Sequence, residues 1–207
     1  MAVFEALFVT PLYRANLGNR LNPDLEAASL LIAAEDKAGR RWAREHGYKG
    51  YTSYAALDDL PLRAPAFADL AKALDRHVGL FARHADFDLA IGGRGQRKLK
   101  LDSLWVNVMR HGAIHAPHIH PHAVVSGTYY ITVPPGSGAI RFEDPRLGLM
   151  MAAPPRRKSA KPANRLFVDV APKPGLLLLW ESWLRHGVQE STAREPRISV
   201  SFNYRLD

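Results

Sequence analysis

From Lys98 onward, the sequence is a succession of short runs of β-forming residues separated by turns, with no helical pattern between them. One run closes at Pro134-Pro135-Gly136-Ser137-Gly138, a strong turn signal. Short strands spaced in this way are typical of an all-β sandwich or barrel. The runs cover residues 104–109, 124–133, 139–142, 166–170, 176–180 and 198–204.

The first half of the chain has a different pattern. Residues 3–16 predict an opening strand that is interrupted at Pro11. A helix is then expected from Asn22 to about Glu45, with Asn22 as the N-cap residue because its side chain can accept a backbone hydrogen bond. A second helix is expected over about residues 65–85, where apolar residues recur at helical spacing.

These patterns predict one domain over residues 1–207. An N-terminal strand and helical annex, residues 1–97, would pack on a β-barrel core, residues 98–207. A glycine-rich turn at residues 92–95 lies near the junction, and it does not have the strand and helix around it that a nucleotide-binding loop needs. The long irregular connection of residues 143–164 is expected to be either a lid or a disordered insertion.

Composition limits the chemistry. The chain has no cysteine, so any metal must be held by nitrogen and oxygen ligands. The net charge of +8 comes from scattered basic residues, which favours a solvated surface over a nucleic-acid site and also suits a small anionic ligand. The basic residues 156–161 are consistent with an anionic or protein substrate.

No run of apolar residues is long enough to cross a membrane, and the N-terminus lacks the positive region of a signal peptide. A cytoplasmic protein is therefore expected. The oligomeric state is open, with a homodimer through the N-terminal helices as one option.

Five of the nine histidines lie within residues 111–122. His118 and His120 are two positions apart, so on an extended strand their side chains point the same way. His186, which follows the apolar run of residues 176–179, offers a third imidazole from a distant strand. Neutral imidazoles suit iron, zinc, copper or nickel, but histidines on strands also serve as core, surface or pH-sensitive residues.

Two of the expected strands carry polar residues on one face. In residues 124–133 this face has Ser126, Thr128, Tyr130 and Thr132, and in the last strand it has Arg197, Ser199, Ser201 and Asn203. The polar faces either meet water, as in an ordinary sandwich, or line the interior of a ligand-holding barrel. In the second case Arg197 is a buried cation that needs an anion, such as a ligand carboxylate with the hydroxyls of Ser199 and Tyr130 beside it.

Together, these residues resemble a known family, the 2-oxoglutarate/Fe(II) oxygenases of bacteria and cyanophages that are related to prolyl hydroxylases. The resemblance covers about residues 98–204 and implies a double-stranded β-helix, which is a jelly-roll, cupin-like barrel. The motifs that carry it are His118-x-His120, Ser126–Tyr130, Phe142–Arg146, Pro174–Leu179, Ser182–His186 and Arg197–Asn203.

The resemblance also implies roles for four residues in binding the co-substrate 2-oxoglutarate. Arg197, eleven positions after His186, matches the arginine that binds the distal carboxylate. Ser199 completes the Arg-x-Ser pair, and Tyr130 matches the tyrosine that helps to hold the same carboxylate. Asn107 stands at the position of another residue that contacts the co-substrate.

For the metal, His118 matches the first Fe(II) ligand and His186 the distal one. The superfamily normally has an Asp or Glu where this chain has His120, so the sequence predicts a three-histidine site. Three other side chains remain open as ligands: Glu143, Asp144 and His122.

The leading hypothesis is a non-haem Fe(II) and 2-oxoglutarate-dependent dioxygenase that uses molecular oxygen to oxidise an unknown primary substrate. One alternative is a cupin-like three-histidine enzyme that does not use 2-oxoglutarate, because Gly112-x5-His118-x-His120 also resembles the first cupin motif, without that motif's Glu. The other alternative is a non-catalytic barrel that binds a sugar or nucleic acid and has structural histidines.

Overall fold

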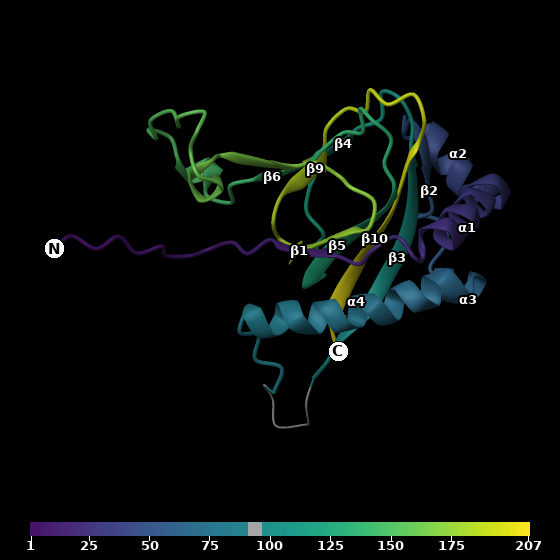
Figure 1. Cartoon of the computed structure of the whole chain (residues 1–207), viewed down its shortest axis with the longest axis horizontal. Helices are drawn as coiled ribbons and strands as arrows, with labels where there is room; N and C mark the ends of the chain where they lie inside the picture. The colour runs from purple at the N-terminus through teal and green to yellow at the C-terminus, as the bar shows by residue number, and fades with distance from the viewer. Residues whose placement is uncertain (91–96) are drawn as a thin grey trace.

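The computed structural model describes residues 1–90 and 97–207, and the predicted glycine-rich turn lies outside this part of the chain. Two antiparallel sheets form the core (Figure 1). The larger has the strand order β1-β8-β5-β10-β3-β2, and the smaller has the order β4-β9-β6-β7. The prediction of a mainly β jelly-roll barrel with N-terminal helices is confirmed.

Within the described residues, the strands are β1 (Tyr13–Asn16), β2 (Gly50–Thr52), β3 (Leu99–Met109), β4 (His115–His118), β5 (Val125–Thr132), β6 (Ile140–Glu143), β7 (Phe167–Val170), β8 (Leu176–Glu181), β9 (His186–Val188) and β10 (Arg197–Leu206). The helices are α1 (Asn22–Glu35), α2 (Lys37–Glu45), α3 (Leu60–Arg63) and α4 (Pro65–His84), with two short 3-10 helices, η1 (Leu147–Leu149) and η2 (Pro162–Asn164). None of the described helices has the length and hydrophobicity needed to span a bilayer.

The helices cover the outer face of the larger sheet (Figure 1). On α4, apolar side chains at helical spacing are fully buried against residues of β3, β5, β8 and β10, and this burial of apolar surface holds the helical layer to the sheet. The buried residues of α4 are Ala66, Phe67, Leu70, Leu74, Val78, Phe81 and Ala82.

The predicted helix over residues 22–45 is two helices. Asp36 interrupts it, because its carboxylate accepts hydrogen bonds from the backbone N–H of Gly39 (2.9 Å) and the hydroxyl of Tyr51 (2.9 Å), and so caps α2. The prediction of Asn22 as N-cap is also wrong. Its amide nitrogen donates to the carbonyl of Ile131 (2.7 Å) and its amide oxygen accepts from Tyr129 (2.5 Å), which ties α1 to β5.

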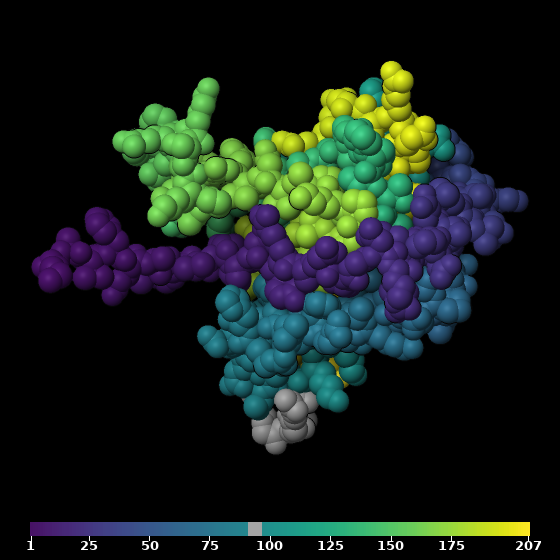
Figure 2. Space-filling model, in the orientation of Figure 1, coloured from purple at the N-terminus to yellow at the C-terminus, as the bar shows by residue number. Residues whose placement is uncertain are grey.

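The opening strand is shorter than predicted. Only Tyr13–Asn16 pairs with another strand, β8. Residues 3–9 pair with no strand of residues 1–90 or 97–207, and their large apolar side chains are exposed. The N-terminal segment extends away from the body of the molecule next to residues 144–166 (Figure 2). The expected irregular connection is present in these residues as turns and the two 3-10 helices.

The inner face of the larger sheet carries the polar residues. Ser199 on β10 lies opposite Tyr130 on β5 and Asn107 on β3, so the three form one row across adjacent strands. All three are almost fully buried, with Ser199 only 1% exposed. The barrel interpretation of the polar faces is therefore correct, and the alternative in which they meet water is wrong.

Candidate active site

Three histidines converge where the two sheets face each other. His118 and His186 are opposite each other in the pair of β4 and β9. His120 lies beyond the end of β4, where its backbone N–H donates to the carbonyl of Ser182 (3.1 Å). The prediction that His118 and His120 share one strand is thus wrong, but one ring nitrogen from each of the three histidines lies within 4.8 Å of the others.

Backbone carbonyls fix the tautomers of two of these rings. Nδ1 of His118 lies 2.8 Å from the carbonyl oxygen of Ala116, and Nδ1 of His186 lies 2.8 Å from that of Leu184. Because a carbonyl oxygen only accepts, both Nδ1 atoms carry the hydrogen and donate. The Nε2 atoms of both rings therefore keep the lone pair that a metal needs.

Burial keeps His120 and His186 uncharged. It lowers the pKa of His186 to about 3, and the charges of the neighbouring histidines act in the same direction, although the hydrogen bond to Leu184 opposes this. Burial and the charge of His118 lower the pKa of His120 to about 4. Both imidazoles are therefore neutral at pH 7, which is the form that binds metal ions.

The other candidate ligands lie outside the cluster. Glu143 pairs with Arg185 (3.4 Å), and Asp144 with Arg146 (2.9 Å). His122 is exposed in a turn with a φ of 70°. Among the described residues, the only set of three or more potential ligands that comes together is the three histidines, with no carboxylate.

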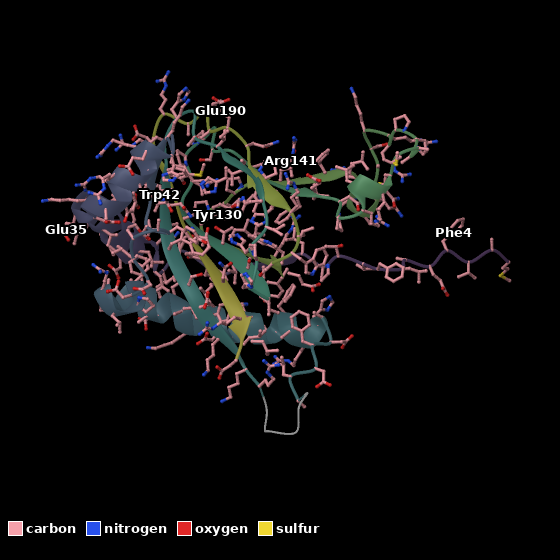
Figure 3. The ribbon with its side chains drawn as sticks, turned by 180° about the vertical axis from the view of Figure 1, so that it is seen from behind. Phe4, Glu35, Trp42, Tyr130, Arg141 and Glu190 are labelled. Atoms are coloured by element: carbon pink, nitrogen blue, oxygen red, sulfur yellow. The ribbon has the colours of Figure 1, made fainter. Side chains whose placement is uncertain are left out.

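A cavity of about 550 Å³ contains the three histidines and the row formed by Asn107, Ser199 and Tyr130. Tyr130 lies at the centre of the molecule, and Trp42 lies by the helices (Figure 3). The ring of Trp180 is 4.6 Å from that of His186, and the ring of Trp105 is 5.8 Å from that of His120. Indole rings therefore lie on two sides of the histidine cluster.

Arg197 is the buried cation of this cavity, with 4% of its surface exposed. Its Nη1 donates to the carbonyl of Gly138 (3.1 Å), Nη2 lies against the sulfur of Met109, and Nε has no partner. Its guanidinium carbon is 5.5 Å from the centre of the Tyr130 ring. No carboxylate of residues 1–90 or 97–207 pairs with it. A buried guanidinium of this kind fits an anionic ligand.

Asn107 and Ser199 add polar groups beside Arg197. The amide nitrogen of Asn107 donates to the hydroxyl of Ser201 (3.1 Å), while its amide oxygen is buried without a partner. Unpartnered polar atoms on Asn107 and Arg197, inside one cavity, are the features expected of a site for a polar ligand.

Sequence reasoning missed several residues of the cavity. Tyr48 and His115 form a hydrogen bond of 2.7 Å on its wall, and Trp42 and Tyr54 also line it. His115 belongs to the histidine cluster in the sequence, which is a signal that could have been used. Tyr48, Trp42 and Tyr54 lie in the helical annex and its turns, where no pattern marks them.

Comparison with known families identifies the strand-rich half. Residues 103–203 match the family model described as "Putative 2OG-Fe(II) oxygenase". The strand-rich part of the chain, residues 103–203, belongs to this family. The matched span contains every predicted site residue, from Asn107 to Ser199. The protein is thus an oxygenase that depends on Fe(II) and 2-oxoglutarate. No protein of curated function matched the chain.

Solved structures support the fold. A prolyl-4-hydroxylase from Pseudomonas putida has 16% identity and a TM-score of 0.62, with 96% of this chain and 95% of that chain covered. HygX from Streptomyces hygroscopicus, solved with nickel and 2-oxoglutarate, has 16% identity and a TM-score of 0.58, with 94% and 82% covered. The viral collagen prolyl hydroxylase of Paramecium Bursaria Chlorella virus-1 has 10% identity and a TM-score of 0.56, with 99% of both covered. At these identities the likeness concerns the fold alone.

Proposed function

We propose that His118, His120 and His186 hold the Fe(II) of this oxygenase and that Arg197 binds the distal carboxylate of 2-oxoglutarate. The observation that carries the proposal is the buried guanidinium, without an anionic partner among the described residues, in the same cavity as three converging imidazoles. A carboxylate would give the guanidinium the charge-assisted hydrogen bonds that its burial demands.

The metal site would be a three-histidine site. When bound there, iron supplies the redox chemistry by which 2-oxoglutarate and oxygen oxidise a C–H bond. The chain contributes neutral nitrogen ligands, whose orientation is fixed by the carbonyls of Ala116 and Leu184. Without a protein carboxylate the metal keeps its full positive charge, which should strengthen the binding of a dianionic co-substrate.

Ser199 and Tyr130 would complete the co-substrate pocket. Both side chains point into the cavity next to Arg197, and both hydroxyls can donate to a carboxylate. Burial raises the pKa of Tyr130, so it remains a neutral donor at pH 7. Asn107 lies beside Ser199, and its free amide oxygen suits a bound water molecule or hydroxyl.

Trp105 and Trp180 would shield the reacting groups from water. Their rings flank His120 and His186 and replace solvent around the metal by apolar surface. Removing water from such a site strengthens the electrostatic interactions inside it and protects reactive species.

Production of succinate from 2-oxoglutarate, with Fe(II) and ascorbate under air, tests the proposal. We expect slow turnover without a primary substrate in the wild type and none in Arg197→Met. Equal succinate production by the two proteins would contradict the role of Arg197. Stoichiometric metal without any binding of 2-oxoglutarate would favour a cupin-like enzyme, and the lack of any metal binding would favour a non-catalytic module.

We also propose that molecular oxygen is the second co-substrate. The chain would form a single domain over residues 1–207 in a cytoplasmic protein. Two copies would associate through their N-terminal helices as a homodimer. Oxygen uptake coupled to succinate formation tests the first point. Light scattering after size-exclusion chromatography tests the homodimer, and a monomeric mass would exclude it.

A further inference from the structure

Tyr48 and His115 form a pair in the wall of the cavity that the proposed roles do not use. The phenol oxygen lies 2.7 Å from Nε2 of His115, and the ring centres are 5.1 Å apart. His115 stands at the start of β4. Tyr48 belongs to the turn between α2 and β2, outside the span that the family model matches. The pair therefore joins the helical annex to the barrel at the cavity.

Tyr48 and Arg197 line the same cavity, and the strand register relates the segments that carry them. Gly50 on β2 is opposite Met109 on β3, and Met109 is opposite Arg197 on β10, so the three form one row. Tyr48 precedes this row by two residues. Gly50 has a φ of +146°, and a Cβ atom there would collide with the carbonyl oxygen of Val108, so only glycine lets β2 approach β3 this closely.

Tyr48 is a neutral hydrogen-bond donor in the same cavity as a buried cation. Burial raises the pKa of its phenol, although the charge of Arg197 opposes this. The phenol therefore keeps its hydrogen at pH 7, and it lines the cavity together with the buried guanidinium of Arg197. Such a hydroxyl can donate a hydrogen bond to an anion without adding a second positive charge.

We infer that the Tyr48 hydroxyl, oriented by His115, donates a hydrogen bond to the carboxylate that Arg197 pairs with. When Nε2–H of His115 donates to the phenol oxygen, the hydroxyl hydrogen of Tyr48 is free to point at the ligand. The annex then closes the co-substrate pocket over the distal end of 2-oxoglutarate. This inference rests on the role proposed for Arg197.

Ligand selectivity separates this role from a purely structural one. 2-Oxobutyrate has the same 1-carboxylate and 2-oxo group as 2-oxoglutarate but lacks the distal carboxylate. A hydrogen bond from Tyr48 to that carboxylate affects 2-oxoglutarate alone. A pair that only braces β4 against the turn would affect both acids equally when it is broken.

Isothermal titration calorimetry of the nickel-loaded full chain with each acid provides the test. Tyr48→Phe is expected to weaken 2-oxoglutarate binding about tenfold, as for the loss of a hydrogen bond to a charged group, and to leave 2-oxobutyrate unchanged. His115→Phe should weaken 2-oxoglutarate binding by a smaller factor. Tyr13→Phe is the matched control, because Tyr13 forms the same kind of hydrogen bond with His77 (2.7 Å) outside the cavity, and it should bind both acids like the wild type.

The Arg197→Met variant distinguishes the inference about Tyr48 from the proposed function. If Tyr48→Phe binds 2-oxoglutarate like the wild type while Arg197→Met does not, the inference is wrong and the proposed function stands. Equal weakening of both acids in Tyr48→Phe would likewise overturn the inference, in favour of a structural role. If Arg197→Met also binds 2-oxoglutarate like the wild type, the proposed function fails and the inference with it.

Discussion

His118 and His186 lie directly opposite each other across the antiparallel pair of β4 and β9, whereas His120 lies beyond the end of β4. Replacing either strand residue by Ala is expected to remove at least nine-tenths of the bound metal, because two nitrogen ligands cannot hold a divalent ion tightly. His120→Asp, which restores the superfamily's usual ligand set, should retain the bound metal. Metal content after dialysis checks these outcomes.

His122→Ala is the control for this series, because His122 is exposed and lies outside the cluster. It should retain the metal content of the wild type. A normal metal content in His186→Ala would show that the ion is held elsewhere.

Arg197→Met should lose 2-oxoglutarate binding without losing stability. Among the described residues, the Nε of the buried wild-type guanidinium has no hydrogen-bond partner and no carboxylate pairs with the group, which destabilises the protein when no ligand is present. Replacing it by a side chain of similar length is expected to raise the free energy of unfolding of the ligand-free protein by about 1–2 kcal/mol. Urea unfolding measures this change.

The order of stability of the wild type and Arg197→Met should change when 2-oxoglutarate is added. 2-Oxoglutarate should raise the melting temperature of nickel-loaded wild type and leave that of Arg197→Met unchanged, since only a protein that binds the ligand is stabilised by it. A variant that is less stable than the wild type by several kcal/mol would mean that Arg197 has a structural partner.

Acid should destabilise the metal-free protein through its buried histidines. In the unfolded chain a histidine has a pKa near 6.5, whereas burial lowers the folded pKa of His186 to about 3 and of His120 to about 4. The unfolded state therefore takes up more protons below pH 6.5. Stability is full above that pH and falls as the pH drops toward 4, by at most about 1.4 kcal/mol per pH unit for each histidine.

Urea unfolding of chelator-treated protein between pH 7.5 and 5 measures this slope. His186→Gln should make the slope shallower by about one proton, and His84→Gln, a change at an exposed position of α4, should leave it as in the wild type. A stability that does not change over this range would contradict the burial of the cluster.

Much of the site follows from local patterns in the sequence. Period-2 alternation puts Tyr130 and Ser199 on the polar faces of their strands, and the structure aligns them in one row. Alternation alone, however, leaves open whether a polar face meets water or a cavity. That choice depends on which sheet face the helices cover, and this is decided by packing between residues far apart in the chain.

The predictions that are wrong have the same origin, namely packing between residues far apart in the chain. Asn22 has the side chain of a good cap, but tertiary contacts with Ile131 and Tyr129, more than a hundred residues away, use its amide instead. Residues 3–9 have strand propensity, but no strand in the described part of the chain pairs with them. Tyr48 lines the cavity from the connection before β2, and Gly50 allows that strand to lie close to β3. Secondary-structure propensity is a property of one segment, and it does not determine which other segments pack against that segment.

The packing around Gly127 on β5 is tighter than the sequence alone indicates. A Cβ atom there would lie 2.6 Å from the carbonyl oxygen of Leu178 and would collide with the ring of Phe202. Gly127→Ala must push apart β5, β8 and β10, and we expect a loss of about 1–3 kcal/mol in the free energy of unfolding. Gly148→Ala is the matched control, because no atom lies within 4 Å of its Cβ position, and it should change stability by less than about 0.5 kcal/mol. Equal stabilities of the two variants in urea unfolding would mean that the sheet is less tightly packed around Gly127 than these contacts require.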